Sequence, residues 1–182
     1  MTALASRGQL RASVLRWGLF TVPLCLLGVI PGRLWTADTA WFQSLAKPAI
    51  FPPPIWFGIV WTTLFVLMGI ALALVCSAWG ARLRTPAISA FAAQFLVNLA
   101  WTPVFFGMQR ISGGLIVLAI LDVLVIVTVV LFWRVRRLAG ALLLPYLAWI
   151  LFATVLNWQF LALNPEGGVE RADSGAQQRY EF

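Results

Sequence analysis

Long apolar runs constrain this chain more than any other feature of its sequence. They predict helices over residues 14–30, 55–79, 87–108, 115–133 and 138–163. A helix needs about 20 apolar residues to cross the ~30 Å hydrocarbon core of a bilayer. The last four runs approach or exceed that length, and the first can borrow flanking residues. The runs are continuous and lack the two-residue alternation of a β-barrel. We therefore predict an all-α integral membrane protein, a bundle of five transmembrane helices.

The composition excludes an ordinary soluble protein. Hydrophobic residues make up 62% of the 182 residues and charged residues 10%, whereas soluble domains hold about 25% charged residues. The net charge of +7 could suggest a nucleic-acid partner. The arginines are scattered through short gaps between apolar runs, however, and this pattern is a signal of membrane topology. We expect the lipid bilayer as a partner, and no nucleic acid.

The distribution of basic residues also predicts an orientation. With five spans, eight Lys and Arg residues lie on the side of the N-terminus and five on the other. The positive-inside rule then places the N-terminus in the cytoplasm, if the protein lies in an inner membrane. The chain has no histidine, which is the commonest metal ligand. We therefore expect no metal site and no obligatory cofactor.

Three segments lie outside the expected helices or join them. Residues 1–13 are a basic N-terminal segment, and residues 164–182 are a polar tail that we expect to be disordered. Residues 31–54 form the longest internal connection and hold five prolines. The membrane domain accordingly spans residues 14–163.

Two helix faces combine aromatic rings with polar or small side chains. Gln94, Asn98 and Trp101 follow the spacing i, i+4, i+7 of a single face, and Trp149 and Ala153 share a face of the last helix. Such a face suits a flat ligand with polar edges. Hydrogen bonding between helices explains the amides equally well, and both interpretations stay open from spacing alone.

Asp122 is the only acid within an expected span. An acid at membrane depth is a functional candidate by default. A neutral carboxyl group bonded to another helix accounts for this residue equally well.

Several stretches of the sequence resemble the TspO/MBR family, the tryptophan-rich sensory proteins that include the translocator protein. The matching stretches are WFQSLAKP at 41–48, a double proline at 52–53, VWTTL at 60–64, QFLVNLAWTPVFFG at 94–107, PYLAW at 145–149 and FATVLN at 152–157. Their order and spacing hold over about residues 14–163. The resemblance implies a five-helix bundle, usually a homodimer, with a pocket that opens toward the 31–54 loop as a lid.

The resemblance also implies which residues hold a ligand. The expected pocket residues are Phe57, Gly58, Val60, Trp61, Asn98, Trp101, Trp149, Ala153 and Leu156. The expected residues of the lid and the mouth of the pocket are Arg33, Trp41, Lys47, Pro52 and Pro53.

The function implied is that of a membrane receptor or carrier-like protein. It would bind porphyrins and similar flat hydrophobic molecules, with a role in tetrapyrrole sensing, transport or regulation. Free-base porphyrin is favoured over haem because histidine is absent. One alternative is an enzyme-like, light-dependent degradation of porphyrin by Trp61 and Trp149, with no other catalytic residues expected. A second alternative is a regulatory scaffold that acts through a partner protein.

Overall fold

A computed structural model describes residues 7–167 of the chain, and the regular structure in that range is helical. Five helical segments within it are long and apolar enough to cross a membrane, which confirms the predicted fold class. The elements in chain order are α1 (Arg7–Leu26), α2 (Val29–Leu34), α3 (Ala40–Ser44), α4 (Pro54–Cys76), α5 (Arg84–Thr102), the π-helical turn η1 (Pro103–Gly107), α6 (Ile111–Val135) and α7 (Arg137–Leu163).

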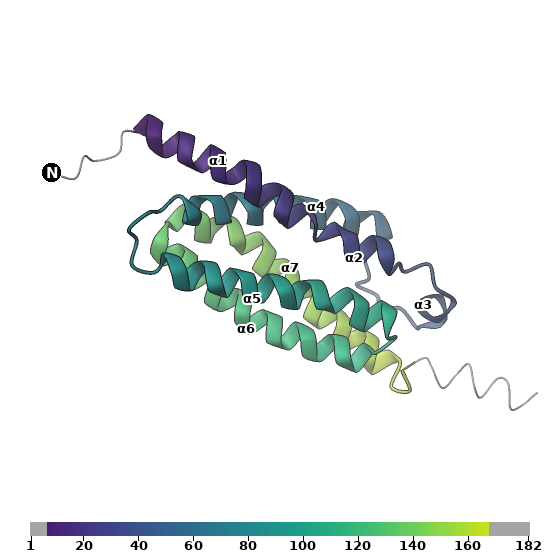
Figure 1. The fold of residues 1–182 in the computed structure, drawn as a ribbon. Helices are drawn as coiled ribbons and strands as arrows, with labels where there is room; N and C mark the ends of the chain where they lie inside the picture. Colours follow the sequence, from purple (N-terminus) through teal and green to yellow (C-terminus); the bar gives the residue numbers. More distant parts are fainter. Residues whose placement is uncertain (1–6, 168–182) are drawn as a thin grey trace, which may run out of the picture.

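The long helices form a ring in which sequence neighbours are not always spatial neighbours. Helix α1 packs on α4, α4 on α7, α7 on α6 and α6 on α5. The short helix α2 reaches the far end of α5 and completes the ring (Figure 1). This order leaves one end of the bundle, beyond α2, to be covered by the segment that contains α3.

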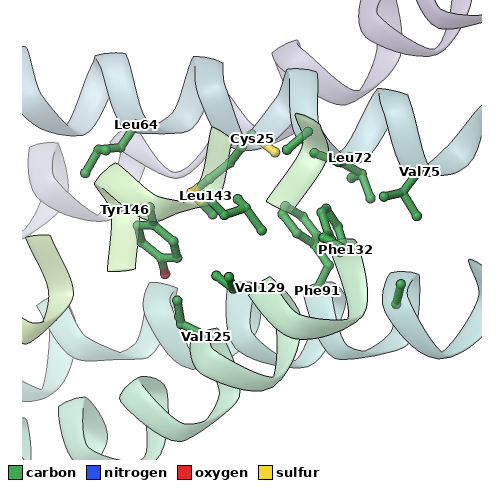
Figure 2. Packing of buried hydrophobic residues seen from close by; sticks show 14 of the residues in the cluster. Cys25, Leu64, Leu72, Val75, Phe91, Val125, Val129, Phe132, Leu143 and Tyr146 are labelled. Carbon is green, nitrogen blue, oxygen red and sulfur yellow. The ribbon is translucent and has the colours of Figure 1, made fainter. Parts of the chain in front are cut away.

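The main core lies toward the other end of the bundle, and three of the long helices supply its largest buried side chains. Phe65 and Met68 of α4, Phe132 of α6 and Tyr146 of α7 are at most 2% exposed. Figure 2 shows Phe91 of α5 beside Phe132, and their rings stack with centroids 5.7 Å apart. Close packing of this kind contributes van der Waals attraction between helices in lipid, where burial of apolar surface gives little driving force.

Glycine permits the closest approach between α1 and α4. A Cβ atom added at Gly69 would lie 2.6 Å from the Cα of Val22. At the same place the Thr21 hydroxyl donates a hydrogen bond of 2.7 Å to the Gly69 carbonyl oxygen. The small residue therefore allows backbone contact that a side chain would prevent.

The first helix starts earlier and breaks earlier than predicted. Helix α1 begins at Arg7, so the expected 1–13 segment is helical over residues 7–13, while residues 1–6 lie outside the described range. Pro23 lies inside α1 and lacks the backbone N–H that continues the hydrogen-bond ladder. The chain breaks at 27–28 and then re-forms helix in α2 up to Leu34, inside the stretch expected to be a loop.

Helix α6 also starts earlier than the expected residue 115. The expected start at residue 115 is wrong, because α6 begins at Ile111 and includes Gly113 and Gly114. A Cβ at Gly114 would lie 2.8 Å from the Asn157 Oδ1 atom of α7 and 3.3 Å from the Trp101 Nε1 atom of α5. The glycine therefore provides space for packing between helices.

The end of the chain is ordered further than predicted. Residues 164–167 form a turn after α7, and Asn164 is 5% exposed. The expected disorder of the 164–182 tail is thus wrong for its first four residues. The remaining part of that prediction falls on residues 168–182, which lie outside the described range.

Candidate ligand-binding site

A large cavity lies inside the bundle at the end covered by the α1–α4 connection. Its volume is about 840 Å³, within the ~300–1,000 Å³ typical of sites for small organic molecules. Side chains from α2, α4, α5, η1, α6 and α7 line it. Its aromatic lining consists of Trp35, Phe42, Phe51, Phe57, Trp61, Phe65, Trp101, Phe105, Phe106, Trp149 and Phe160.

Most of the residues expected in the pocket do line this cavity. They are Phe57, Gly58, Trp61, Asn98, Trp101, Trp149, Ala153 and Leu156. Val60 is the exception, because it lines a shallow outer groove between α4 and α7 together with Pro145 and Phe152. Val60 is partly buried and packs against the main core.

Of the five residues expected at the lid and the mouth, one lines the cavity and four do not. Arg33, at the end of α2, lines the cavity. Trp41, Lys47, Pro52 and Pro53 do not belong to its lining. The ammonium group of Lys47 lies 5.4 Å from the centroid of the Phe42 ring, and the Phe42 ring itself lines the cavity.

Asn98 is fixed by two buried residues that lie behind the cavity wall. Its Nδ2 atom donates a hydrogen bond of 2.9 Å to the Tyr146 hydroxyl, which donates one of 2.8 Å to the Gln94 Oε1 atom. The two amides therefore do bond between helices, which was one of the two open interpretations, while Asn98 also lines the cavity. Sequence reasoning missed Tyr146, although its position three residues before Trp149 on α7 was a usable signal.

A second hydrogen-bonded chain holds the indole of Trp101. The Trp101 Nε1 atom donates to the Asn157 Oδ1 atom at 3.3 Å, and the Asn157 Nδ2 atom donates to the Ile111 carbonyl at 2.9 Å. The Trp101 ring also stacks on Phe105 with a centroid separation of 5.1 Å. Residues of three helices and η1 thus fix the orientation of this cavity wall.

The α1–α4 connection covers the end of the cavity, and its Phe42 and Phe51 side chains line it. Trp41 and Phe42 of α3 are buried in an aromatic cluster with Phe105 and Phe160. Trp41 lies in the layer behind the cavity wall, and Phe42 contributes to the wall itself. The Thr39 hydroxyl caps α3 by accepting a hydrogen bond from the Phe42 backbone N–H at 3.2 Å.

Three hydrogen bonds tie this connection to the end of α7. Asn164 accepts from the Ala46 N–H at 2.9 Å and donates to the Ala46 carbonyl at 3.0 Å. The Trp41 Nε1 atom donates to the Gly167 carbonyl at 3.1 Å. On the opposite side of the connection, Gly107 of η1 leaves room for Trp35, whose Nε1 atom would lie 2.7 Å from an added Cβ.

Asp122 takes no part in the cavity wall. Its Oδ2 atom accepts a hydrogen bond of 2.9 Å from the Thr154 hydroxyl, which joins α6 to α7. This contact agrees with the interpretation of a carboxyl group bonded to another helix.

Comparison with known proteins agrees with this architecture. Residues 19–163 match the TspO/MBR family. The chain is similar to protein CrtK of Rhodobacter capsulatus, with 42% identity over 127 residues that cover 69% of this chain and 79% of that protein. The tryptophan-rich protein TspO of Chlorobaculum tepidum is 39% identical over 147 residues, which cover 79% of this chain and 93% of that one. The human translocator protein is 35% identical over 120 residues, which cover 65% and 71%. The chain therefore belongs to the TspO/MBR family and is an integral, multi-pass membrane protein with a receptor-like cavity.

Proposed function

We propose that this protein binds a porphyrin, in free-base form, in the cavity between its helices. The observation that carries the proposal is the position of three indoles, Trp61, Trp101 and Trp149, which come from three different helices and line one cavity of about 840 Å³. Indole faces attract a flat aromatic macrocycle through stacking and apolar burial. The volume is sufficient for a molecule much larger than a single aromatic ring.

Two polar positions suit the edges of such a ligand. Asn98 brings one amide into a wall that is otherwise largely apolar, and Arg33 brings a cation to the end near α2. A guanidinium group pairs well with carboxylates, so Arg33 is suited to a propionate side chain. Lys47 lies on the α1–α4 connection, with its ammonium group near the Phe42 ring. The ammonium group would have to move away from that ring to pair with a second propionate.

A light-dependent degradation of porphyrin is the second candidate function. Trp61 and Trp149 both line the cavity, which supports electron transfer from either indole to an excited macrocycle. Illumination of the purified protein with protoporphyrin distinguishes the two functions. New chromophore products that are lost in Trp61→Phe and Trp149→Phe would favour the enzyme, whereas unchanged porphyrin with retained binding would favour the receptor.

The site at Ala153 gives a direct test of binding. Ala153 lines the cavity, whereas Ala162 of the same helix is exposed. Ala153→Leu fills part of the site, and overfilling costs about 1–3 kcal/mol, or roughly 5- to 150-fold in affinity. The matched variant Ala162→Leu should bind protoporphyrin like the wild type in a tryptophan-quenching titration. Equal affinity of all three proteins would exclude the cavity as the porphyrin site.

We also propose that the protein is a homodimer, as its family resemblance implies. The outward face of α5 supports this, because Ser89, Ala92 and Ala93 are exposed there and small residues permit close helix contact in lipid. Large side chains at Ala92 and Ala93 should convert the protein to a monomer in mild detergent. A mass unchanged by both substitutions would place the dimer contact elsewhere.

A further inference from the structure

The chain of hydrogen bonds behind Asn98 can run in either of two directions. Gln94 and Tyr146 are 0% and 1% exposed, and Asn98 is 7% exposed. A primary amide has a carbonyl oxygen at one end and an NH₂ group at the other, with nearly the same shape when turned by 180°. A tyrosine hydroxyl both donates and accepts. If both amides turn, Gln94 donates to Tyr146 and Tyr146 donates to Asn98, and both bonds are kept.

Nothing at the buried end of this chain fixes its direction. The Gln94 Nε2 atom is buried and has no hydrogen-bond partner within residues 7–167. When the direction of the hydrogen bonds is reversed, the carbonyl oxygen of the Gln94 amide occupies the position of the Nε2 atom. Each direction therefore leaves one amide atom of Gln94 unpaired, and the two directions make the same number of hydrogen bonds. A ligand that binds one direction of the hydrogen bonds more tightly than the other can shift the populations of the two directions.

The direction decides what Asn98 offers to the cavity. In the direction of the structure the Asn98 Nδ2 atom is bound to Tyr146, so the carbonyl oxygen remains for a ligand. In the reversed direction the oxygen is bound and the NH₂ group remains. We propose that Gln94 and Tyr146 are specificity-determining residues, through which this one position accepts a ligand carrying either a hydrogen-bond donor or an acceptor.

This inference rests on the proposed function, and its chemistry is that of flat macrocycles with a polar group at one edge. Tyr146 and Gln94 do not line the cavity, so they are positioning residues that act through Asn98. Removal of Gln94 should fix the direction. In Gln94→Met, Asn98 is the remaining partner of the Tyr146 hydroxyl, which satisfies its own hydrogen by donating to Asn98. The NH₂ group is then left for the ligand, and acceptors are preferred.

Three porphyrins of matched shape test the proposal. Octaethylporphyrin has no polar edge group, its meso-amino derivative brings a donor whose nitrogen lone pair is delocalised into the macrocycle, and its meso-formyl derivative brings an acceptor. The wild type should bind both derivatives more tightly than the parent. Gln94→Met should prefer the formyl compound over the amino compound by about fivefold, the order of one hydrogen bond. Tyr146→Phe should reduce both preferences, and Gln159→Met on α7, outside the cavity wall, should behave as the wild type.

Nuclear magnetic resonance tests the relay without any ligand. The sequence holds three asparagines, Asn98, Asn157 and Asn164, so asparagine labelled with ¹⁵N gives three side-chain NH₂ signals. In Gln94→Met the Asn98 signal should move away from its hydrogen-bonded position while the other two stay. An unmoved Asn98 signal, or equal affinity of Gln94→Met for both derivatives, would overturn the relay. A wild type that binds none of the porphyrins would instead overturn the proposed function, and the NMR result would still decide the relay.

Discussion

Asn164 is the residue whose replacement should most directly open the covered end of the cavity. Its side chain makes two hydrogen bonds to the backbone of Ala46, at 2.9 and 3.0 Å, and a third of 2.9 Å to the Phe160 carbonyl. The two bonds to Ala46 join positions 118 residues apart in the sequence. Asn164→Ala removes all three and leaves the helices themselves unchanged, so it should release the 31–54 connection without unfolding the bundle.

The expected size of the effect follows from the exposure of each partner. A hydrogen bond contributes about 0.5–1.5 kcal/mol net, which gives an upper limit of about 4.5 kcal/mol for three. Ala46 is exposed, and water can therefore replace its two lost partners. We expect the local opening of the connection to become about 1–2 kcal/mol easier, a factor of roughly 5 to 30.

Amide hydrogen exchange measures this opening directly. The Ala46 N–H should exchange about 5 to 30 times faster in Asn164→Ala, while amides in the core helix α4 should keep their rates. Gln43→Ala is the matched control, because its exposed hydrogen bond of 3.3 Å to Ala37 should contribute little. Faster exchange should accompany faster association and dissociation of porphyrin. If the Ala46 rate does not change, or if α4 exchanges faster to the same extent, Asn164 does not act as a local tether.

Five further substitutions test the packing and the topology. Gly69→Ala should lower stability by about 1–3 kcal/mol because its Cβ meets the backbone of α1, whereas Gly58→Ala on the same helix has free space and should raise or preserve the melting temperature. Trp101→Leu should weaken porphyrin binding and also lower the melting temperature, because it removes a stacked ring and a hydrogen bond. Cysteines at Ser112 and Arg136 lie near opposite ends of α6 and should react with impermeant reagents from opposite sides, with Arg136 facing the cytoplasm.

The thickness of the bilayer explains why the number of membrane-spanning segments could be predicted from the sequence and the ends of the helices could not. A span must hold about 20 apolar residues, so the count follows from the runs alone. The ends depend on packing. Gly114 continues α6 because Asn157 and Trp101 need the space beside it, and propensity alone predicts a break there.

Site residues that follow helical periodicity could be predicted from the sequence, whereas site residues whose role depends on packing between helices could not. The faces that carry Trp101 and Trp149 follow helical periodicity, and both residues line the cavity. Tyr146 was missed because a lone tyrosine in an apolar run resembles a residue at the membrane interface. Its role depends on Gln94 and Asn98 of α5, 52 and 48 residues away, and no local pattern encodes that contact.

The covered end of the cavity gives the strongest reason to treat the loop as part of the site. Phe42 and Phe51 line the cavity from the α1–α4 connection, and a segment without helical periodicity gives no sign of which side chains point inward. Their positions depend on tethers at the end of α7, where Asn164 and Gly167 follow the last apolar run. Substitutions in the α1–α4 connection, or in residues 164–167 after α7, can therefore change how fast a ligand enters or leaves. The three indoles that would stack against the ligand stay in place on their helices.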